Sequence, residues 1–205
     1  MPPGKRVQKS YNASMESKKG FLLVASPGLV DPNFVRTVVF VAEHNEEGAL
    51  GLILNRAGVL AVKDLWLSLS GDTAVTERKT FLGGPVQKNA VLLLHGYDDL
   101  AGENTPIVPG VYLGSEVEVL AELVRRDAPA SGEARPGRYR VFCGYSGWGA
   151  GQLDAELSAG GWITVPATAE HVFDQPADRL WNTTIASTGG AHKFFALMPP
   201  DPEMN

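Results

Sequence analysis

The residues whose types and spacing best suit chemistry lie in the stretch 144–152, which reads Gly-Tyr-Ser-Gly-Trp-Gly-Ala-Gly-Gln. A dinucleotide-binding G-x-G-x-x-G does not fit, because Gly151 comes one place early when counted from Gly147. A nucleophile elbow G-x-S-x-G around Ser146 fails because Trp148 stands where the closing glycine should be. A phosphate-binding loop needs G-K-[ST], which occurs nowhere in the chain. Two interpretations stay open: the glycines let the backbone pass close to another element, or their N–H groups hold a ligand.

Three further segments could contribute to a site. Glu43 and His44 follow an apolar run, and a histidine there could act as a general base, although an exposed or core histidine is the commoner case. Asn55 and Arg56 end the next apolar run, where a guanidinium can bind a carboxylate or phosphate or make a structural ion pair. Gly83-Gly84-Pro85 is read first as a tight turn between strands and second as a binding loop.

Cysteine and histidine usage excludes several classes of site. Cys143 is the only cysteine, so an intramolecular disulfide and a structural thiolate zinc site are impossible, and the cytoplasm is the simplest compartment. The four histidines are widely spaced, with no H-E-x-x-H pair. The sequence therefore predicts no catalytic residue, no metal and no cofactor.

Charge is distributed unevenly along the chain. The net charge is −5, but residues 1–20 hold five basic side chains against one acidic one, so the remaining 185 residues carry −9. An acidic body argues against direct nucleic-acid binding, which normally uses a clustered basic face. The basic arm is expected to be a flexible tail, with weak nucleic-acid contact as a minor alternative. No run approaches the length of a membrane helix, so no membrane contact is predicted.

Apolar runs and turn residues predict the elements that must position these side chains. Short apolar runs bounded by Gly, Pro and Asn read as strands, and short loops between the first three predict antiparallel pairing. The best helix has apolar residues at i, i+3, i+4 and i+7 after a Ser115–Glu118 capping box. The predicted strands are 21–25, 34–42, 50–54, 80–82, 90–94, 111–113, 139–144 and 162–165; the predicted helices are 62–69, 116–126, 153–157 and 178–186.

This mixture predicts an α+β fold with mostly antiparallel strands and a few packed helices. No composition shift divides residues 20–190, so we expect one domain there, with a flexible basic tail at 1–19 and a C-terminal extension at 191–205. The high content of glycine and proline, 23 and 14 residues, is typical of a turn-rich chain with few long helices.

Several of these segments, taken together and in this order, resemble the AlgH/YqgE family of bacterial proteins. The resemblance covers roughly residues 20–186. Ala57 and Ser146 depart from the family's frequent proline and alanine at those places. The segments that carry it are FLLVASPGLVDPNF from Phe21, TVV from Thr37, EHN from Glu43, GALGL from Gly48, NR from Asn55, GGPV from Gly83, GYSGWGAGQL from Gly144, and Trp162.

The resemblance implies a compact α+β domain with folded-over sheets in the bacterial cytoplasm, without an established activity or cofactor. Some members are labelled transcriptional regulators. We therefore expect a non-enzymatic binding or regulatory role with a protein partner or small ligand. The alternative is an enzyme or small-ligand-binding protein that uses a cleft near His44, Arg56 and the 144–152 turn. The candidate ligand-binding residues are Glu43, His44, Asn55, Arg56, Gly83, Gly84, Tyr145, Ser146, Trp148 and Gln152.

Overall fold

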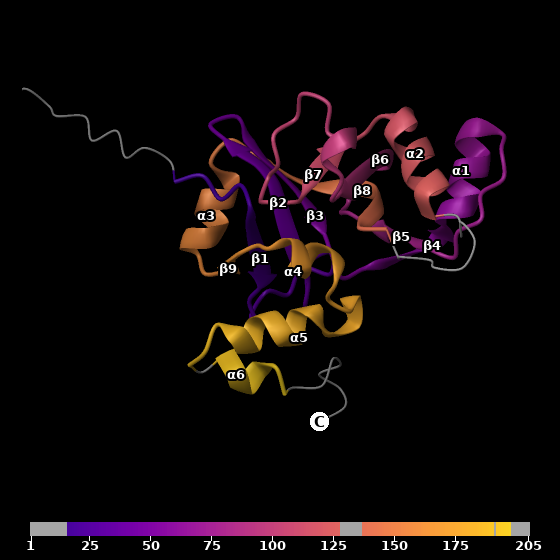
Figure 1. The fold of residues 1–205 in the computed structure, drawn as a ribbon. Helices are drawn as coiled ribbons and strands as arrows, with labels where there is room; N and C mark the ends of the chain where they lie inside the picture. The colour runs from indigo at the N-terminus through magenta and orange to yellow at the C-terminus, as the bar shows by residue number, and fades with distance from the viewer. Residues whose placement is uncertain (1–15, 128–136, 191, 198–205) are drawn as a thin grey trace, which may run out of the picture.

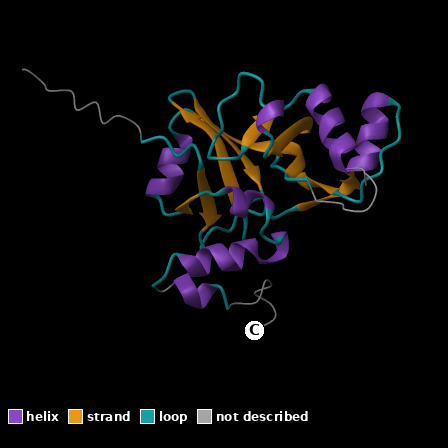
Figure 2. Cartoon of the chain, viewed as in Figure 1, coloured by secondary structure: helices purple, strands orange, loops and turns teal. Residues whose placement is uncertain are grey.

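The computed structural model describes residues 16–127, 137–190 and 192–197, and the arrangement of its elements is shown in Figure 1. The described chain begins with four strands and ends with three helices, and strands and helices are interspersed between them; Figure 2 distinguishes the two by colour. The strands are β1 (Phe21–Ala25), β2 (Val38–Asn45), β3 (Gly48–Ile53), β4 (Ala57–Ala61), β5 (Lys79–Leu82), β6 (Val86–His95), β7 (Tyr112–Gly114), β8 (Tyr139–Gly149) and β9 (Trp162–Pro166). The helices are α1 (Val62–Ser70), a 3-10 turn η1 (Asp98–Leu100), α2 (Val117–Asp127), α3 (Gln152–Ser158), α4 (Ala169–Phe173), α5 (Ala177–Ser187) and α6 (His192–Phe195).

Hydrogen bonding joins the nine described strands into one mixed sheet. The main path runs β4-β5-β8-β3-β2-β1-β9, while β6 pairs with β8 and β7 pairs with β6. Among the described strand pairs only β5 and β8 run parallel. The single α+β domain with mostly antiparallel pairing is thus confirmed. The antiparallel β1-β2-β3 order expected from the short loops is confirmed as well.

The long strand β8 organises the sheet because it pairs with three others. Phe142 lies opposite Phe81 of β5 and also opposite Leu92 of β6, so these strands occupy the two edges of β8. Gly144 adopts a positive φ of 72°, and Phe142 and Tyr145 pack against the same core although they are three residues apart. The strict alternation of faces is therefore broken at Gly144, as at a β-bulge. We call residues 139–143 the side-chain half of β8 and residues 144–149 its glycine half.

The link from β5 to β6 crosses the glycine half of β8. β5 and β6 lie on opposite edges of β8, so Gly83-Gly84-Pro85 must pass over its backbone. A Cβ added to Gly83 would lie 2.1 Å from the Gly144 carbonyl oxygen, and one on Gly84 would lie 2.3 Å from the Tyr145 carbonyl. Only glycine permits an approach this close. The two glycine clusters of the sequence are therefore one structural feature, a backbone-on-backbone crossing.

Helices cover both faces of the sheet. One core faces α4 and α5 and includes Phe40, Leu52, Phe142 and Trp181. On the opposite face, α1 and α2 cover the end near Val141, and α3 covers the end near Trp148. Figure 1 shows α1 and α2 side by side at one end of the molecule, α3 at the other, and α5 with α6 beneath the strands.

Several sequence-based boundaries need correction. The 144–152 stretch is not a turn: β8 continues to Gly149 because its glycine half pairs with β3, and only Ala150 and Gly151 connect it to α3. The second strand begins at Val38 rather than at residue 34, since residues 32–36 form a turn. The Ser115 amide donates to the carboxylate of Glu116, not Glu118. β4 and α4 were not predicted at all.

The proposed division of the chain at residues 19 and 190 stays a prediction. The tail residues 1–15 and the extension residues 191 and 198–205 lie outside the described part of the chain. Ser17 and Lys18, which the sequence places in the tail, hydrogen-bond to His44 of β2. Helix α6, in the predicted extension, lies against α5.

Candidate functional site: an acidic, aromatic cleft over the glycine half of β8

Two hollows flank the glycine half of β8, one on each face of the sheet, and we call them together the Gly147 cleft. An open, shallow hollow of about 460 Å³ is lined by Glu43, Glu47 and other residues of the β2–β3 hairpin, and by Tyr145 of β8. A second hollow of about 400 Å³ is lined mainly by aromatic and small residues before β2 and around α3. The two hollows share Gly147 and Trp148. The absent side chain at Gly147 leaves room in the first hollow.

A carboxylate fixes the aromatic wall of the second hollow. The indole N–H groups of Trp148 and Trp162 both donate to the same oxygen of Glu156, at 2.9 and 2.8 Å. The other carboxylate oxygen accepts from the Gln152 side-chain amide at 3.0 Å, and the Gln152 carbonyl oxygen accepts from the Gly149 N–H at 3.1 Å. Each buried indole thus has its partner, and the rings are held in one orientation.

Phe34 completes this wall as a third ring. It stacks near Trp148 with centroids 6.1 Å apart and meets Trp162 edge-on at 5.4 Å. Asp31 and Glu156 also line this hollow, whereas no lysine or arginine of the described chain lines either part of the cleft. Aromatic faces beside carboxylates attract cations, since both present negative potential.

His44 does not contribute to the cleft. Its side chain is buried, its Nδ1 accepts from the Lys18 backbone N–H at 2.9 Å, and its Nε2 lies 3.6 Å from the Asp154 carboxylate. The Ser17 hydroxyl donates to its carbonyl oxygen. Alternation along β2 explains the separation: Glu43 is exposed to the cleft and His44 points inward. In this structure His44 fastens the chain that enters β1.

Asn55 and Arg56 hold the 31–37 loop against the end of β3. Asn55 accepts from the Val38 N–H and donates to the Arg36 carbonyl, each at 2.8 Å. Arg56 donates from one Nη to the carbonyls of Pro32 and Val35 at 3.1 and 3.4 Å. The pair therefore positions the loop that carries Phe34. Arg56 also lines a separate hollow of about 170 Å³ together with Gly84 and Cys143.

Ser146 is part of the backbone crossing. It is fully buried, and its hydroxyl donates to the Gly83 carbonyl at 3.1 Å, an oxygen that also accepts from the Ile53 N–H at 3.0 Å. This hydroxyl, which stands where the resembling family often has alanine, is thus engaged in holding the link between β5 and β6.

The ten candidate residues therefore separate into groups. Glu43, Tyr145, Trp148 and Gln152 line the Gly147 cleft. His44, Asn55, Ser146 and Gly83 have structural hydrogen bonds or contacts, and Arg56 with Gly84 lines the separate hollow. Sequence reasoning missed Phe34, Glu47 and Glu156. Trp148, Gln152 and Glu156 follow one another at intervals of four residues. The helical spacing of Gln152 and Glu156 was the available sequence signal for Glu156.

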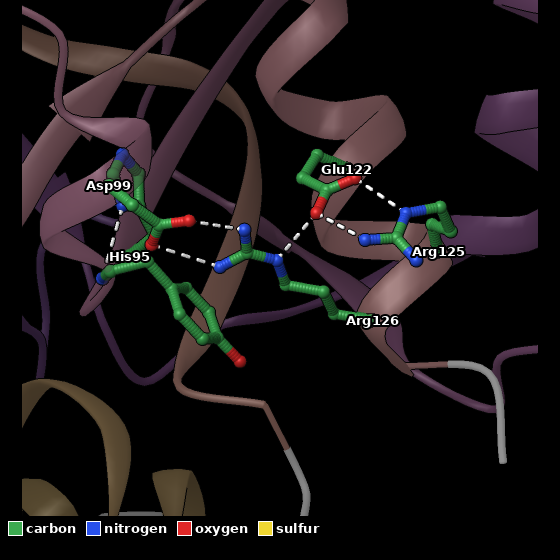
Figure 3. Close-up of polar contacts among 6 residues, drawn as sticks. His95, Asp99, Glu122, Arg125 and Arg126 are labelled. Atoms are coloured by element: carbon green, nitrogen blue, oxygen red, sulfur yellow. Dashed lines mark hydrogen bonds and ion pairs between the residues drawn. The ribbon is translucent and has the colours of Figure 1, made fainter. Parts of the chain in front are cut away.

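A second charged cluster joins η1 to α2, remote from β8's glycine half in the sequence. Arg126 lies between Asp99 and Glu122 and bonds to both, and Arg125 also bonds to Glu122, as Figure 3 shows. These two guanidinium groups lower the pKa of Glu122 to about 2. Burial lowers the pKa of the neighbouring His95, which stacks on Tyr112. Because Arg126 and both of its carboxylates are paired with one another, this cluster fastens α2 in place.

The residues that the structure describes hold neither a cluster suited to a metal ion nor a membrane-spanning helix. No group of three or more His, Cys, Asp or Glu side chains there is arranged to hold a metal ion. No helix in residues 16–127, 137–190 and 192–197 is long and apolar enough to cross a membrane.

Fold and cleft together define a class: an α+β domain in which a crossing of two glycine segments supports a Trp-walled, acidic cleft. A family model described as AlgH-like matches residues 22–193, and the chain belongs to this family. Two curated relatives are named only as UPF0301 proteins. The one from Chlorobaculum tepidum is 39% identical over 188 residues, covering 92% of this chain and 96% of the relative. The one from Thioalkalivibrio sulfidiphilus is 34% identical over 169 residues, covering 82% and 87%.

Solved structures agree with the fold. The solution structure of the AlgH protein from Pseudomonas aeruginosa is 30% identical, with a TM-score of 0.68 and coverage of 96% of this chain and 98% of that one. A crystal structure of a Corynebacterium diphtheriae protein is 23% identical, with a TM-score of 0.69 and coverage of 90% and 94%, and supports the fold alone. The expected family is thereby confirmed.

Proposed function

We propose that this protein is a non-enzymatic binding protein of the bacterial cytoplasm whose Gly147 cleft takes a basic, extended segment of a partner protein. The observation that carries the proposal is the composition of the cleft. Four aromatic rings and exposed carboxylates line it, and no cationic side chain of the described chain does. A regulatory role follows if binding that segment controls the partner.

Charge favours a cationic occupant. Glu43 and Glu47 are exposed on the β2–β3 hairpin, and Asp31 is exposed at the opposite end of the cleft. Glu156 is different, because its two oxygens already accept three hydrogen bonds. The exposed carboxylates therefore supply the attraction, and Glu156 supplies the rigidity of the wall. The same charge opposes direct DNA binding at this surface.

Shape favours an extended segment over a small cation. The two hollows share Gly147 and Trp148, and β3 is the described strand that pairs with β8 there, so one extended chain can pass around the other edge of β8 from one hollow to the other. Guanidinium groups stack on aromatic faces and pair with carboxylates, which suits an arginine side chain seated against Trp148 and Phe34. A rigid aromatic wall gives such a residue little entropy to lose on the protein side.

The test uses a fluorescein-labelled ten-residue peptide of alternating arginine and serine, measured by fluorescence anisotropy with the purified full-length protein. Gly147→Ala places a methyl group in the first hollow, 3.3 Å from the movable Tyr145 ring, and we expect about a tenfold weaker affinity. Gly149→Ala is the matched control, because its methyl group meets nothing nearer than 4.0 Å.

Charge is tested separately. The double variant Glu43→Gln, Glu47→Gln removes two carboxylates of the cleft, and we expect about a fivefold loss of affinity, consistent with about 0.5 kcal/mol for each exposed charge. Glu46→Gln, on the same hairpin but outside the lining, should leave the affinity unchanged. Equal binding of a peptide with glutamate in place of arginine would refute the proposal. So would free arginine binding as tightly as the peptide, which would indicate a small-cation site instead.

A further inference from the structure

A further cavity lies over the side-chain half of β8. It is lined by basic side chains, whereas the Gly147 cleft is acidic. It has a volume of about 250 Å³ and is lined by Arg78, Lys79 and Arg140, with Phe81 and Phe173 as apolar walls. No Asp or Glu of the described chain lines it. Three cations around one cavity are unexpected in a protein whose net charge is −5.

Arg140 is the most telling of these residues. Only 8% of it is exposed, and its two Nη atoms donate to the carbonyls of Leu54 and Gln175 at 2.7 and 3.1 Å. None of the described carboxylates lies within ion-pair distance of its guanidinium. Burial lowers the pKa of Arg140 to about 10, although Asp174 partly opposes this effect. A buried charge that has neutral acceptors but no counter-ion is costly, and an anion in the adjoining cavity would stabilise it.

Arg78 and Lys79, the other two basic residues of the cavity, have different roles. Arg78 is already engaged: it pairs with Asp127 and donates to the carbonyls of Gly137 and Tyr139. It shapes the cavity and has its charge balanced. Lys79 is exposed at the start of β5, and its ammonium has no hydrogen bond or ion pair with any residue that the structure describes. Lys79 can therefore reach a ligand without breaking an existing contact.

Nearby acidic groups do not cancel this charge. Asp127 is engaged by Arg78, Thr76 and Tyr139, and Asp174 is paired with Arg138 on the adjoining segment. The unbalanced charges that remain belong to Lys79 and Arg140. Guanidinium and ammonium groups together are a common arrangement for binding oxyanions.

We propose that this cavity binds a small molecule through a phosphate or carboxylate group, held by Lys79 and Arg140, with its apolar part between Phe81 and Phe173. The volume is below the range of about 300–1,000 Å³ that is usual for drug-sized ligands, so the ligand is small. The proposal is independent of the Gly147 cleft and does not rest on the function proposed for it.

The test measures binding of inorganic phosphate and of succinate by isothermal titration calorimetry, with sodium chloride keeping the ionic strength constant. Lys79→Gln should weaken binding about tenfold, while Lys63→Gln, a nearby lysine that pairs with Glu77 outside the cavity, should not change it. A stronger response to phosphate indicates a phosphate ester as the natural ligand, and a stronger response to succinate indicates a carboxylate.

Nuclear magnetic resonance of Arg140 provides a second measurement, which detects binding of phosphate or succinate even if the affinity is low. The ¹⁵N resonance of Arg140 Nε should shift on adding phosphate or succinate and stay unchanged with glycerol. An equal loss of binding in Lys79→Gln and Lys63→Gln would overturn the proposal, as would an Arg140 resonance that responds to neither anion. Neither result bears on the Arg-peptide test, because Lys79 and Arg140 do not line the Gly147 cleft.

Discussion

The two halves of β8 build opposite surfaces from one strand. In the side-chain half, Tyr139, Val141 and Phe142 fill cores on both faces, and Arg140 faces a basic cavity. In the glycine half, the backbone itself is the packing surface, since Gly144 and Tyr145 touch the crossing glycines. The acidic cleft lies over this second half. In one half of the strand, stability thus comes from packed side chains. In the other half it comes from close backbone contacts that only glycine allows.

This difference predicts how each half tolerates substitution. Close backbone contacts leave no room for relaxation, whereas a side-chain network can lose one member and rearrange around it. Substitutions at the crossing should therefore cost more free energy of unfolding than substitutions around Arg78 or Glu156. The following predictions test that order.

The largest effect is expected for Gly83→Ala. Its methyl group would lie 2.1 Å from the Gly144 carbonyl oxygen, and backbone rather than a flexible side chain would have to move. We expect a loss of more than about 4 kcal/mol in the free energy of unfolding, or failure to fold. Gly28→Ala is the control, because nothing lies within 4 Å of the added methyl group. Urea denaturation followed by circular dichroism measures both, and a loss below about 1 kcal/mol would contradict the crossing.

An intermediate effect is expected for Asp127→Asn beside the side-chain half of β8. Asp127 accepts hydrogen bonds from Thr76 and Tyr139 and pairs with Arg78, so the variant leaves Arg78 without its counter-ion. We expect a loss of about 2 kcal/mol at pH 7. Asp72→Asn, in an exposed loop, should change the free energy of unfolding by less than about 0.5 kcal/mol.

The same variant has a defined pH dependence. Burial raises the pKa of Asp127, but the hydrogen bonds from Thr76 and Arg78 outweigh it, and the pKa falls below its ordinary value of 3.8. The carboxylate therefore contributes its full stability above about pH 4, and this contribution is lost as the pH falls through the lowered pKa. The advantage of the wild type over Asp127→Asn should shrink below pH 4. An advantage that grew there would show that the pKa is raised instead.

The smallest effect is expected for Glu156→Gln in the wall of the Gly147 cleft. An amide oxygen can still accept from both indoles, but the amide nitrogen then meets the donor of Gln152. We expect a loss of about 1 kcal/mol and a change in tryptophan fluorescence. Glu46→Gln, which is exposed on the hairpin, should alter neither. If Glu156→Gln cost more than Gly83→Ala, the contrast between the backbone crossing and the side-chain networks would be wrong.

Local sequence signals predicted the elements that depend on local chemistry. The first strand at 21–25 agrees with β1, and the helix at 116–126 agrees with α2 to within one residue, because apolar runs and periodicity specify them. The glycine half of β8 was missed because glycine has a low strand propensity. Its strand conformation depends on β3 and on Gly83, which are distant in the sequence.

The site was predicted only in part for the same reason. Glu43, Tyr145, Trp148 and Gln152 belong to recognisable segments, and they do line the cleft. His44 and Asn55 hydrogen-bond to Lys18 and Val38, which are 26 and 17 residues away in the sequence, so these bonds are not readable from a local pattern. The spacing of Gln152 and Glu156 indicates their contact within α3, but the bonds from Trp148 and Trp162 to Glu156 depend on how α3 packs against β8 and β9.

The crossing also constrains the order in which the chain can assemble during synthesis. β5 and β6 leave the ribosome first and lie on either side of the position of β8, and β8, separated from β6 by residues 96–138, must later insert between them. Until then β3, β5 and β6 each lack the neighbour that β8 provides. A nascent chain that stops before Tyr139 thus exposes three open strand edges, which are typical templates for aggregation.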